Sequence, residues 1–300
     1  MRLIDVHTHI QFAAFTEDWV EVIKRSLAVD TWLINSGTQK NTSKKAVDIA
    51  ERYAEGVYPH TKRFGVGVYA TVGLHPIHTG KSFHDLQELG DSGEGKIAAR
   101  GEEFDYDYYR GLARHPKVVA IGECGLDFAV CIRKDGEEQY SVGEIEEIKE
   151  KQKAVFIRQI ELAGELKKPI IVHCRDAYPE LIKILKDSRK TLPDNPGVIH
   201  FFSGNEEEAG ELLEMGFCFS FGGIITFAER YAGLVRLIPL EKILLETDAP
   251  YVTPAPFRGK RNEPAYLIYV AQKIAEIKKE EVEEVGRITT ETAVRLFNLF

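Results

Sequence analysis

Six side chains of metal-ligating types stand at the ends of short apolar runs in this sequence. They come from five separate segments and are His7, His9, Glu123, His173, His200 and Asp248. His7 and His9 are two residues apart, so in an extended strand they project to the same side and can grip one ion. Four imidazoles and two carboxylates exceed the three protein ligands of an open catalytic zinc site. The set instead fits two divalent ions that share a bridging carboxylate.

We expect the first ion to be bound by His7, His9, Glu123 and Asp248. The second would be bound by Glu123, His173 and His200, with Glu123 as the bridge. Two ions roughly 3.5–4 Å apart can clamp the attacking and leaving oxygens of a phosphoryl displacement, and they lower the pKa of an attacking water. Asp248 is placed to orient that water or take its proton. Asp248 and Glu123 are therefore the candidate catalytic residues.

Each of these residues also has an ordinary structural explanation when it is taken alone. A His-x-His pair is common in cores and on surfaces, Glu123 could be a buried ion-pair partner, and Asp248 could cap the turn before Pro250. Their joint position at strand ends favours the metal site, because barrel enzymes place their chemistry at the carboxyl ends of the strands. Three other histidines lie in expected loops or helices, and we interpret them as solvated: His60, His84 and His115.

The scaffold that must position these groups is an alternation of short apolar runs and amphipathic segments, which predicts parallel strands covered by helices. Each run is rich in Val, Ile, Leu or Phe, as expected for strands buried on both faces. The eight predicted strands are Leu3–His7, Thr31–Asn35, Val68–Val72, Val118–Ile121, Ile170–His173, Val198–Phe201, Phe217–Phe221 and Ile243–Glu246. Eight strands close a (β/α)8 TIM-like barrel of about 250 residues. We therefore predict an α/β protein with a single domain, residues 1–300, and insertions at its C-terminal rim.

Helices are predicted from apolar stripes between the strands, over segments 19–27, 47–54, 209–213, 267–277 and 290–300. The second would stop at Gly56, and the third would be capped by Ser203 or Asn205 and end at Gly216. Two polar stretches, 77–115 and 129–149, break the regular spacing. We expect both to emerge at the C-terminal rim of the barrel, where loops vary and substrates bind.

Composition narrows the class of protein further. Lys and Arg number 39 and Asp and Glu 47, so the net charge is 39 − 47 = −8, which argues against diffuse binding along a nucleic-acid backbone. A nucleic-acid substrate would have to be held at a local site. The four cysteines form no Cys-x-x-Cys pair, and we interpret them as reduced thiols of a cytoplasmic protein, with Cys124 and Cys174 as buried thiols beside candidate ligands. We expect neither a secretory signal nor a membrane span.

Several motifs, spread in order over nearly the whole chain, resemble the TatD family of metal-dependent deoxyribonucleases. They include Asp5–His9, Gly73–Pro76, Ile121–Asp127, Pro169–Arg175, His200–Gly204, Ser220–Phe227, Glu246–Tyr251 and Arg258–Pro264. The resemblance implies a (β/α)8 metallohydrolase, two divalent ions (Mg, Mn or Zn) and hydrolysis of DNA, often as an exonuclease. It places the metal ligands at the six residues named above. No obligate protein partner is implied.

The resemblance also suggests residues that contact substrate. His75, with His78 beside it, would contact substrate phosphate instead of metal, and Arg175 and Arg258 would be phosphate donors. Arg presents a planar fork that matches phosphate oxygens, although the run from Arg258 could also be a solvated basic loop. Asp127 and Glu246 would orient ligands from behind, and Asp127 could equally be a turn residue.

This sequence departs from the family pattern after Asp127, where Phe128 is followed by Ala129 instead of the usual aromatic pair with an Arg-Asp step. The segment 77–115 is also longer than expected, so substrate size and strand preference stay open. The competing hypotheses are a small-molecule amidohydrolase or lactonase, and a non-catalytic binding module. The former typically bridges its ions with a carboxylated lysine, whereas the fourth strand here ends in Glu123 and offers no lysine.

Overall fold

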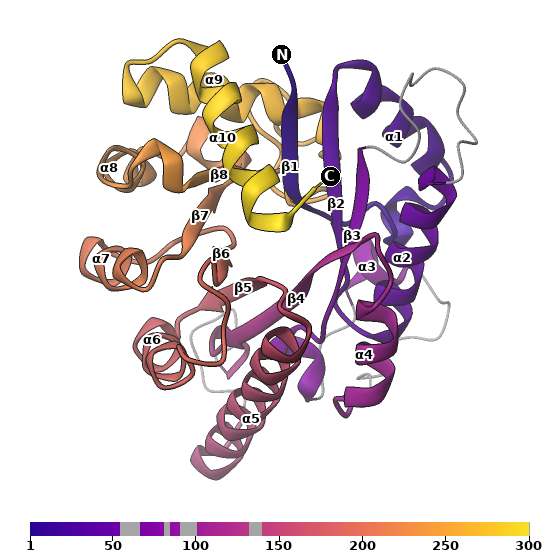
Figure 1. The fold of residues 1–300 in the computed structure, drawn as a ribbon, viewed down its shortest axis with the longest axis vertical. Coiled ribbons are helices and arrows are strands. Elements are labelled where there is room, and N and C mark those ends of the chain that lie inside the picture. Colours follow the sequence, from indigo (N-terminus) through magenta and orange to yellow (C-terminus); the bar gives the residue numbers. More distant parts are fainter. Residues whose placement is uncertain (55–66, 81–84, 91–100, 132–139, 300) are drawn as a thin grey trace.

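The computed structural model describes residues 1–54, 67–80, 85–90, 101–131 and 140–299. Eight parallel strands close into a barrel in sequence order, and helices surround it (Figure 1). The strands are β1 Leu3–Thr8, β2 Thr31–Ser36, β3 Val68–Val72, β4 Val118–Asp127, β5 Ile170–Arg175, β6 Gly197–Ile199, β7 Cys218–Phe221 and β8 Ile243–Leu245. The TIM-like barrel predicted from the sequence is thus confirmed.

Most of the helices lie in the connections between strands. The α-helices of the described residues are α1 Trp19–Ala28, α2 Lys40–Ala54, α3 Leu86–Leu89, α4 Tyr106–Ala113, α5 Val142–Leu166, α6 Tyr178–Asp187, α7 Glu206–Glu214, α8 Ala232–Leu237, α9 Leu267–Lys278 and α10 Val282–Phe297. Short 3-10 turns are η1 Ala13–Phe15, η2 Pro76–Thr79, η3 Ala129–Cys131, η4 Gly223–Thr226, η5 Glu229–Tyr231, η6 Leu240–Lys242 and η7 Pro264–Tyr266. Asn205, one of the two residues expected to cap α7, forms a reciprocal capping box with Glu208.

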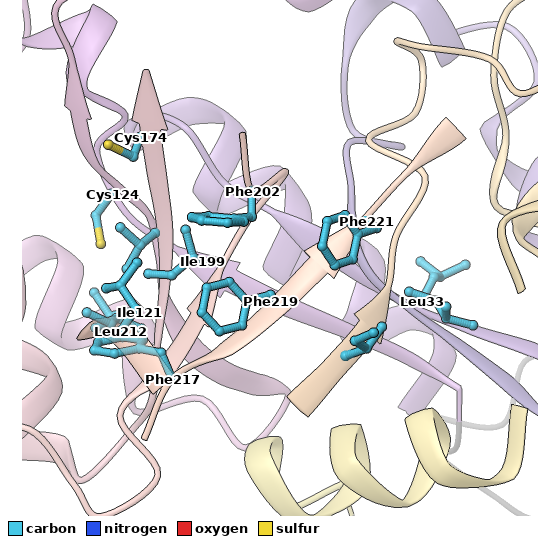
Figure 2. Packing of buried hydrophobic residues seen from close by; sticks show 14 of the residues in the cluster. Leu33, Ile121, Cys124, Cys174, Ile199, Phe202, Leu212, Phe217, Phe219 and Phe221 are labelled. Carbon is cyan, nitrogen blue, oxygen red and sulfur yellow. The ribbon is translucent and has the colours of Figure 1, made fainter. Parts of the chain in front are cut away.

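Side chains alternate between two buried layers, as the pleat of a strand requires. On β2, Leu33 belongs to the larger cluster between barrel and helices, whereas Trp32 and Ile34 belong to a second cluster. Figure 2 shows the larger cluster, in which Phe217, Phe219 and other side chains interlock around the strands. The apolar runs that predicted the strands therefore serve both faces of the barrel wall.

The second cluster joins the strand starts to the last helix. Trp32 and Tyr69, at or near the starts of β2 and β3, pack with Leu296 and Phe297 of α10. The hydroxyl of Tyr69 donates to the carbonyl of Leu299 at 3.2 Å. α10 lies against β1 and β8 (Figure 1) and covers the end of the barrel where the strands begin. The candidate ligands lie at the opposite end of the barrel, where the strands end.

The barrel closes between β1 and β8 through one buried carboxylate. Asp5 is fully buried and pairs with Leu245 in the sheet. Its carboxylate accepts hydrogen bonds from the backbone N–H and the hydroxyl of Thr247, at 2.9 and 2.5 Å. This contact fixes the ends of β1 and β8 against each other, and both ends carry candidate ligands.

The fourth strand is longer than its predicted bounds, which ended at Ile121. β4 continues to Asp127 and pairs with β5 along its length, with a register shift between Ile121 and Cys124. Its glycines allow a close approach of the two strands. A Cβ on Gly125, where φ is +137°, would lie 2.0 Å from the carbonyl oxygen of His173. Glu123 is therefore inside a strand.

The two polar stretches are only partly loops. Within 77–115, residues Tyr106–Ala113 form α4, which contacts β3, β4 and α5 as a regular barrel helix. Within 129–149, α5 begins at Val142. The expectation of loops over both whole stretches was wrong there, because partly buried aromatic side chains such as Tyr106 and a Ser141 cap were hidden in polar sequence. Gly56, His60 and His84 lie outside the described residues.

The four cysteines are buried and unpaired with one another. Figure 2 shows Cys124 and Cys174 beside apolar side chains of the larger cluster. Burial raises the pKa of the Cys124 thiol above its usual range. Within the described residues, no helix has the length and apolar character needed to cross a membrane.

Candidate metal centre

Glu123 stands at the centre of a histidine cluster at the C-terminal end of the barrel. Its Oε2 lies 3.2 Å from Nε2 of His7 and 3.8 Å from Nε2 of His9. Its Oε1 lies 3.1 Å from Nδ1 of His173 and 3.8 Å from Nε2 of His200. The two oxygens of one carboxylate thus face two different groups of histidines.

Asp248 completes the first group. Its Oδ1 lies 3.4 Å from Nε2 of His9 and 3.8 Å from Nε2 of His7, and the two imidazole nitrogens are 3.0 Å apart. Asp248 has a left-handed backbone, with φ 54°, and its N–H donates to the carbonyl of His7. Asp tolerates this conformation better than most residues do. All six side chains expected to bind metal therefore converge at one mouth.

Groups behind the cluster fix the orientation of the imidazoles. Nδ1 of His9 lies 2.8 Å from the carbonyl oxygen of Ser36 and must donate to it. Nδ1 of His200 donates to Glu246 at 2.8 Å, and Nε2 of His173 donates to Asp127 at 3.0 Å. Each outer bond leaves the other ring nitrogen pointing at the cluster, which is how protein ligands to metals are held.

Glu246 is itself held firmly. It accepts hydrogen bonds from the hydroxyl of Ser220 at 2.5 Å and from the backbone N–H of Phe201 at 2.9 Å. These contacts draw β6, β7 and β8 together behind His200. Asp127, at the end of β4, is 4% exposed, and its Oδ1 has no hydrogen-bond partner among the described residues. A buried carboxylate oxygen without a partner is unfavourable unless a cation lies nearby.

The charges of the cluster fit a cation site. Burial alone would lower the pKa of His173, but the carboxylates of Asp127 and Glu123 outweigh burial and raise that pKa to about 10. Burial would likewise lower the pKa of His200, but the carboxylate of Glu246 raises that pKa to about 9. Burial and the neighbouring His200 lower the pKa of His7 to about 4. Without a metal, the carboxylates thus favour protonated, positively charged rings at His173 and His200. A divalent ion would supply positive charge in the same place, so these residues fit a metal.

His75 lies against the same cluster but presents a donor. Its Nε2 is 3.2 Å from Oε1 of Glu123, and its ring is 4.2 Å from that of His173. Its Nδ1 accepts a hydrogen bond from the N–H of Ile77 at 3.2 Å. In a neutral ring the proton must then be on Nε2, which favours contact with an anion over ligation of a metal.

His78 is turned away from the cluster and is held by Glu88 of α3. Nε2 of His78 donates to Oε2 of Glu88 at 3.0 Å. The other oxygen of Glu88, Oε1, accepts hydrogen bonds from the hydroxyl of Thr38 at 2.6 Å and the side-chain amide of Gln39 at 2.8 Å. Burial alone would raise the pKa of Glu88, but these bonds lower it to about 2. Sequence reasoning did not identify Glu88, because no periodic signal links it to its partners.

The two expected arginine donors are exposed at the rim. Arg175 ends β5 and pairs in the sheet with Asp127. Burial would raise the pKa of Asp127, but the hydrogen bond and charge of His173 lower it, with smaller contributions from His75 and Arg175. The guanidinium of Arg258 lies 3.9 Å above the ring of Phe227, and its Nη1 donates to the carbonyl of Thr253 at 3.2 Å. His115, interpreted as solvated, keeps a quarter of its side chain exposed. Sequence reasoning also missed Ser36 and Ser220, since serines at strand ends carry no distinctive signal.

The chain resembles known proteins over its full length. Residues 4–298 match the model of the family described as TatD related DNase. YabD of Bacillus subtilis, named an uncharacterized metal-dependent hydrolase, is 36% identical over 300 residues, which cover 99% of each chain. A Citrobacter rodentium protein named 3'-5' ssDNA/RNA exonuclease TatD is 32% identical over 306 residues, which cover 99% of this chain and 98% of the relative.

A solved structure shows the same barrel. The crystal structure of YJJV, a TatD homolog from Escherichia coli, has a TM-score of 0.77 at 25% identity and covers 100% of this chain and 99% of its own. The family match spans nearly the whole chain, and the two relatives are 36% and 32% identical to it. The chain therefore belongs to the family of TatD-related DNases, and it is a metal-dependent hydrolase.

Proposed function

We propose that this protein hydrolyses phosphodiester bonds of DNA, acting on single strands or ends, with two divalent ions. The observation that carries the proposal is that the two oxygens of Glu123 face different histidines: Oε2 faces His7 and Oε1 faces His173. A carboxylate shared in this way suits two cations side by side. The name of the Citrobacter relative supports a single-stranded substrate and attack from an end.

Each ion has its own set of donors in this proposal. The first would be held by His7, His9, Asp248 and Glu123. The second would be held by His173, His200 and, again, Glu123. Imidazole and carboxylate donors suit Zn and Mn, and carboxylates suit Mg, so the donor set leaves the choice among these three metals open. Asp127 and Glu246 hold the rings of His173 and His200 in place.

The chain's own groups bind and orient the substrate. Bound divalent ions would polarise the phosphoryl oxygens and lower the pKa of an attacking water. Asp248 stays ionised, because its contacts with His9 and His200 lower its pKa although burial raises it. Its carboxylate orients the water and accepts its proton. His75 donates from Nε2 to a phosphate oxygen, His78 supports the same turn, and Arg175 and Arg258 bind phosphates from the rim.

The test is release of nucleotides from a single-stranded DNA oligonucleotide with Mg or Mn, followed by addition of a chelator. We expect activity with the metal and none after chelation. Glu123→Gln should abolish activity, whereas Glu88→Gln, a substitution of a similarly buried glutamate that also pairs with a histidine, should retain it. Nuclease activity that survives in Glu123→Gln would refute the bridging role.

The same preparation separates the amidohydrolase or lactonase alternative. Lactones and cyclic amides are offered under the same metal at the same concentration as the DNA. Turnover of these small molecules without any cleavage of DNA would replace the proposed function. An absence of both, with metal bound, would favour a binding role over catalysis.

A further inference from the structure

An aromatic cluster is formed by the segment after β8, by η7 and by the start of α9, which follow the strand end that carries Asp248. The ring of Phe257 is stacked on that of Tyr266, with centroids 4.4 Å apart and planes 12° apart. Tyr269, one turn further along α9, meets the Phe257 ring edge-on at 5.3 Å. All three residues are partly exposed. Aromatic rings that stack outside the core are costly to leave in water, so this arrangement points to a ligand with flat apolar faces.

A fourth ring is linked to this cluster through Arg258, the residue that follows Phe257. Phe227, which follows η4, is 43% exposed, and the guanidinium of Arg258 covers one face of it at 3.9 Å. Phe227 also lines a hollow of about 190 Å³ between η4 and α9, whose wall holds both cations and carboxylates, with Lys273 paired to Glu276 at 2.8 Å. We call Phe227, Phe257, Tyr266 and Tyr269 the aromatic platform.

Cations are interleaved with these rings. Nζ of Lys260 lies 5.5 Å from the centroid of Phe257. In the described part of the chain, no carboxylate pairs with Lys260 or Arg258, whereas Arg261 is bound by Asp18 at 2.6 Å. This local positive charge stands out on a chain whose net charge is −8. It complements a polyanion such as the phosphate backbone of a nucleic acid.

The aromatic platform is tied to the strand end that carries Asp248. The side-chain amide of Asn262 donates to the carbonyls of Thr247 and Tyr251, both at 2.8 Å. Asn262 is fully buried, so this loop is fixed relative to the metal centre. A chain held at the metal centre can therefore continue over the loop onto the rings.

We propose that the aromatic platform binds bases of a single-stranded DNA whose terminal phosphodiester lies at the metal centre. Flat bases stack on the exposed rings, and Lys260 and Arg258 bind the phosphates between them. Proteins that bind single strands without reading sequence combine stacking rings and cations in this way. The inference rests on the proposed function and adds to it a subsite that accounts for selection of long, single-stranded substrates over short ones.

The experiment compares two substrates with the metal-loaded full-length enzyme: a 15-nucleotide single strand and a dinucleotide, which has one phosphodiester bond and no bases beyond it. The variants are Tyr269→Leu, Phe257→Leu and Lys260→Gln. The matched controls are Tyr106→Leu, a partly exposed tyrosine of α4, and Lys190→Gln, an exposed lysine near the strand starts. Kinetic constants are measured for both substrates, and the sedimentation coefficient of each variant is recorded.

Removal of one ring should lower kcat/KM for the 15-mer at least about fivefold relative to the dinucleotide, through KM, since stacking on a ring contributes appreciably to each bound base. Lys260→Gln should lower the same ratio, with a weaker dependence on salt. An unchanged ratio in Tyr269→Leu and Phe257→Leu overturns the inference while leaving the nuclease activity intact. A ratio unchanged together with an altered sedimentation coefficient would assign the surface to self-association and overturn it as well.

Failure of the proposed function gives a different pattern. If wild-type enzyme cleaves neither substrate, the aromatic platform is tested by binding alone, through the fluorescence anisotropy of a labelled 15-mer. Binding that weakens at least about fivefold in the ring variants, but not in Tyr106→Leu, supports the aromatic platform. Binding that is absent, or equal in all variants, refutes it.

Discussion

Replacement of Glu246 by Gln tests how much the carboxylate behind His200 contributes to metal binding. Gln keeps the shape and can still accept the hydrogen bond from Nδ1 of His200, which is 2.8 Å long, but it removes the negative charge. That charge is the main cause that raises the pKa of His200 to about 9 against the opposing effect of burial. Without it, the Nε2 lone pair that faces the cluster is a weaker donor.

The size of the effect follows from the bond that changes. A hydrogen bond to a charged group contributes about 1.5–3 kcal/mol, and loss of a carboxylate behind a metal-bound histidine weakens metal affinity about 10–100-fold. At about 1.4 kcal/mol for each factor of ten, the two ranges agree. We therefore expect Glu246→Gln to bind one of the two ions about 10–100-fold more weakly and the other with little change.

Isothermal titration of the chelator-treated protein with Mn measures both affinities. Glu88→Gln is the matched control, because Glu88 is also buried and also bonds a histidine, His78, that is turned away from the cluster. It should bind both ions like wild type. Equal affinities in wild type and Glu246→Gln would refute the claim that the carboxylate of Glu246 strengthens metal binding by His200.

Three further results are expected from the structure. The carboxylate of Glu88 has a pKa of about 2 in the fold against 4.5 in the unfolded chain, so it stabilises the fold above pH 4.5 by about 3 kcal/mol, and this is lost as the pH falls toward 2. Urea unfolding of Glu88→Gln should show a flatter dependence on pH in that range, and an unaltered slope would contradict the assignment. Gly125→Ala should destabilise by more than about 3 kcal/mol, because its Cβ would lie 2.0 Å from a carbonyl oxygen of β5, whereas Gly143→Ala, with open space around it, should not destabilise. His75→Gln should keep both ions by elemental analysis and lose activity on DNA; loss of an ion would make His75 a ligand.

The strands and their ends were predictable because they follow from apolar patterning. The run Val68–Val72 is bounded by Gly67 and Gly73, and the structure reproduces those bounds. The ligand types at the strand ends then placed His7 and His200 at one mouth, since the carboxyl ends of parallel strands meet there. The length of β4 was not predictable, because Gly122 and Gly125 are typical of turns and their role depends on contact with β5.

Contacts between distant segments were beyond sequence reasoning. The chain of bonds from Ser220 through Glu246 to His200 joins three strands whose order has to be known first. Similarly, the bond between His78 and Glu88 depends on how α3 lies against the barrel. The start of α4 was hidden because Tyr106 and its neighbours alternate acidic and aromatic residues, and their burial depends on packing against α5.

Diffraction at the manganese edge from crystals grown with Mn tests the central claim most directly. Two anomalous peaks per chain are expected, one on each side of Glu123, with His7 and His9 at one and His173 and His200 at the other. A single peak, or peaks that do not contact Glu123, would contradict the account.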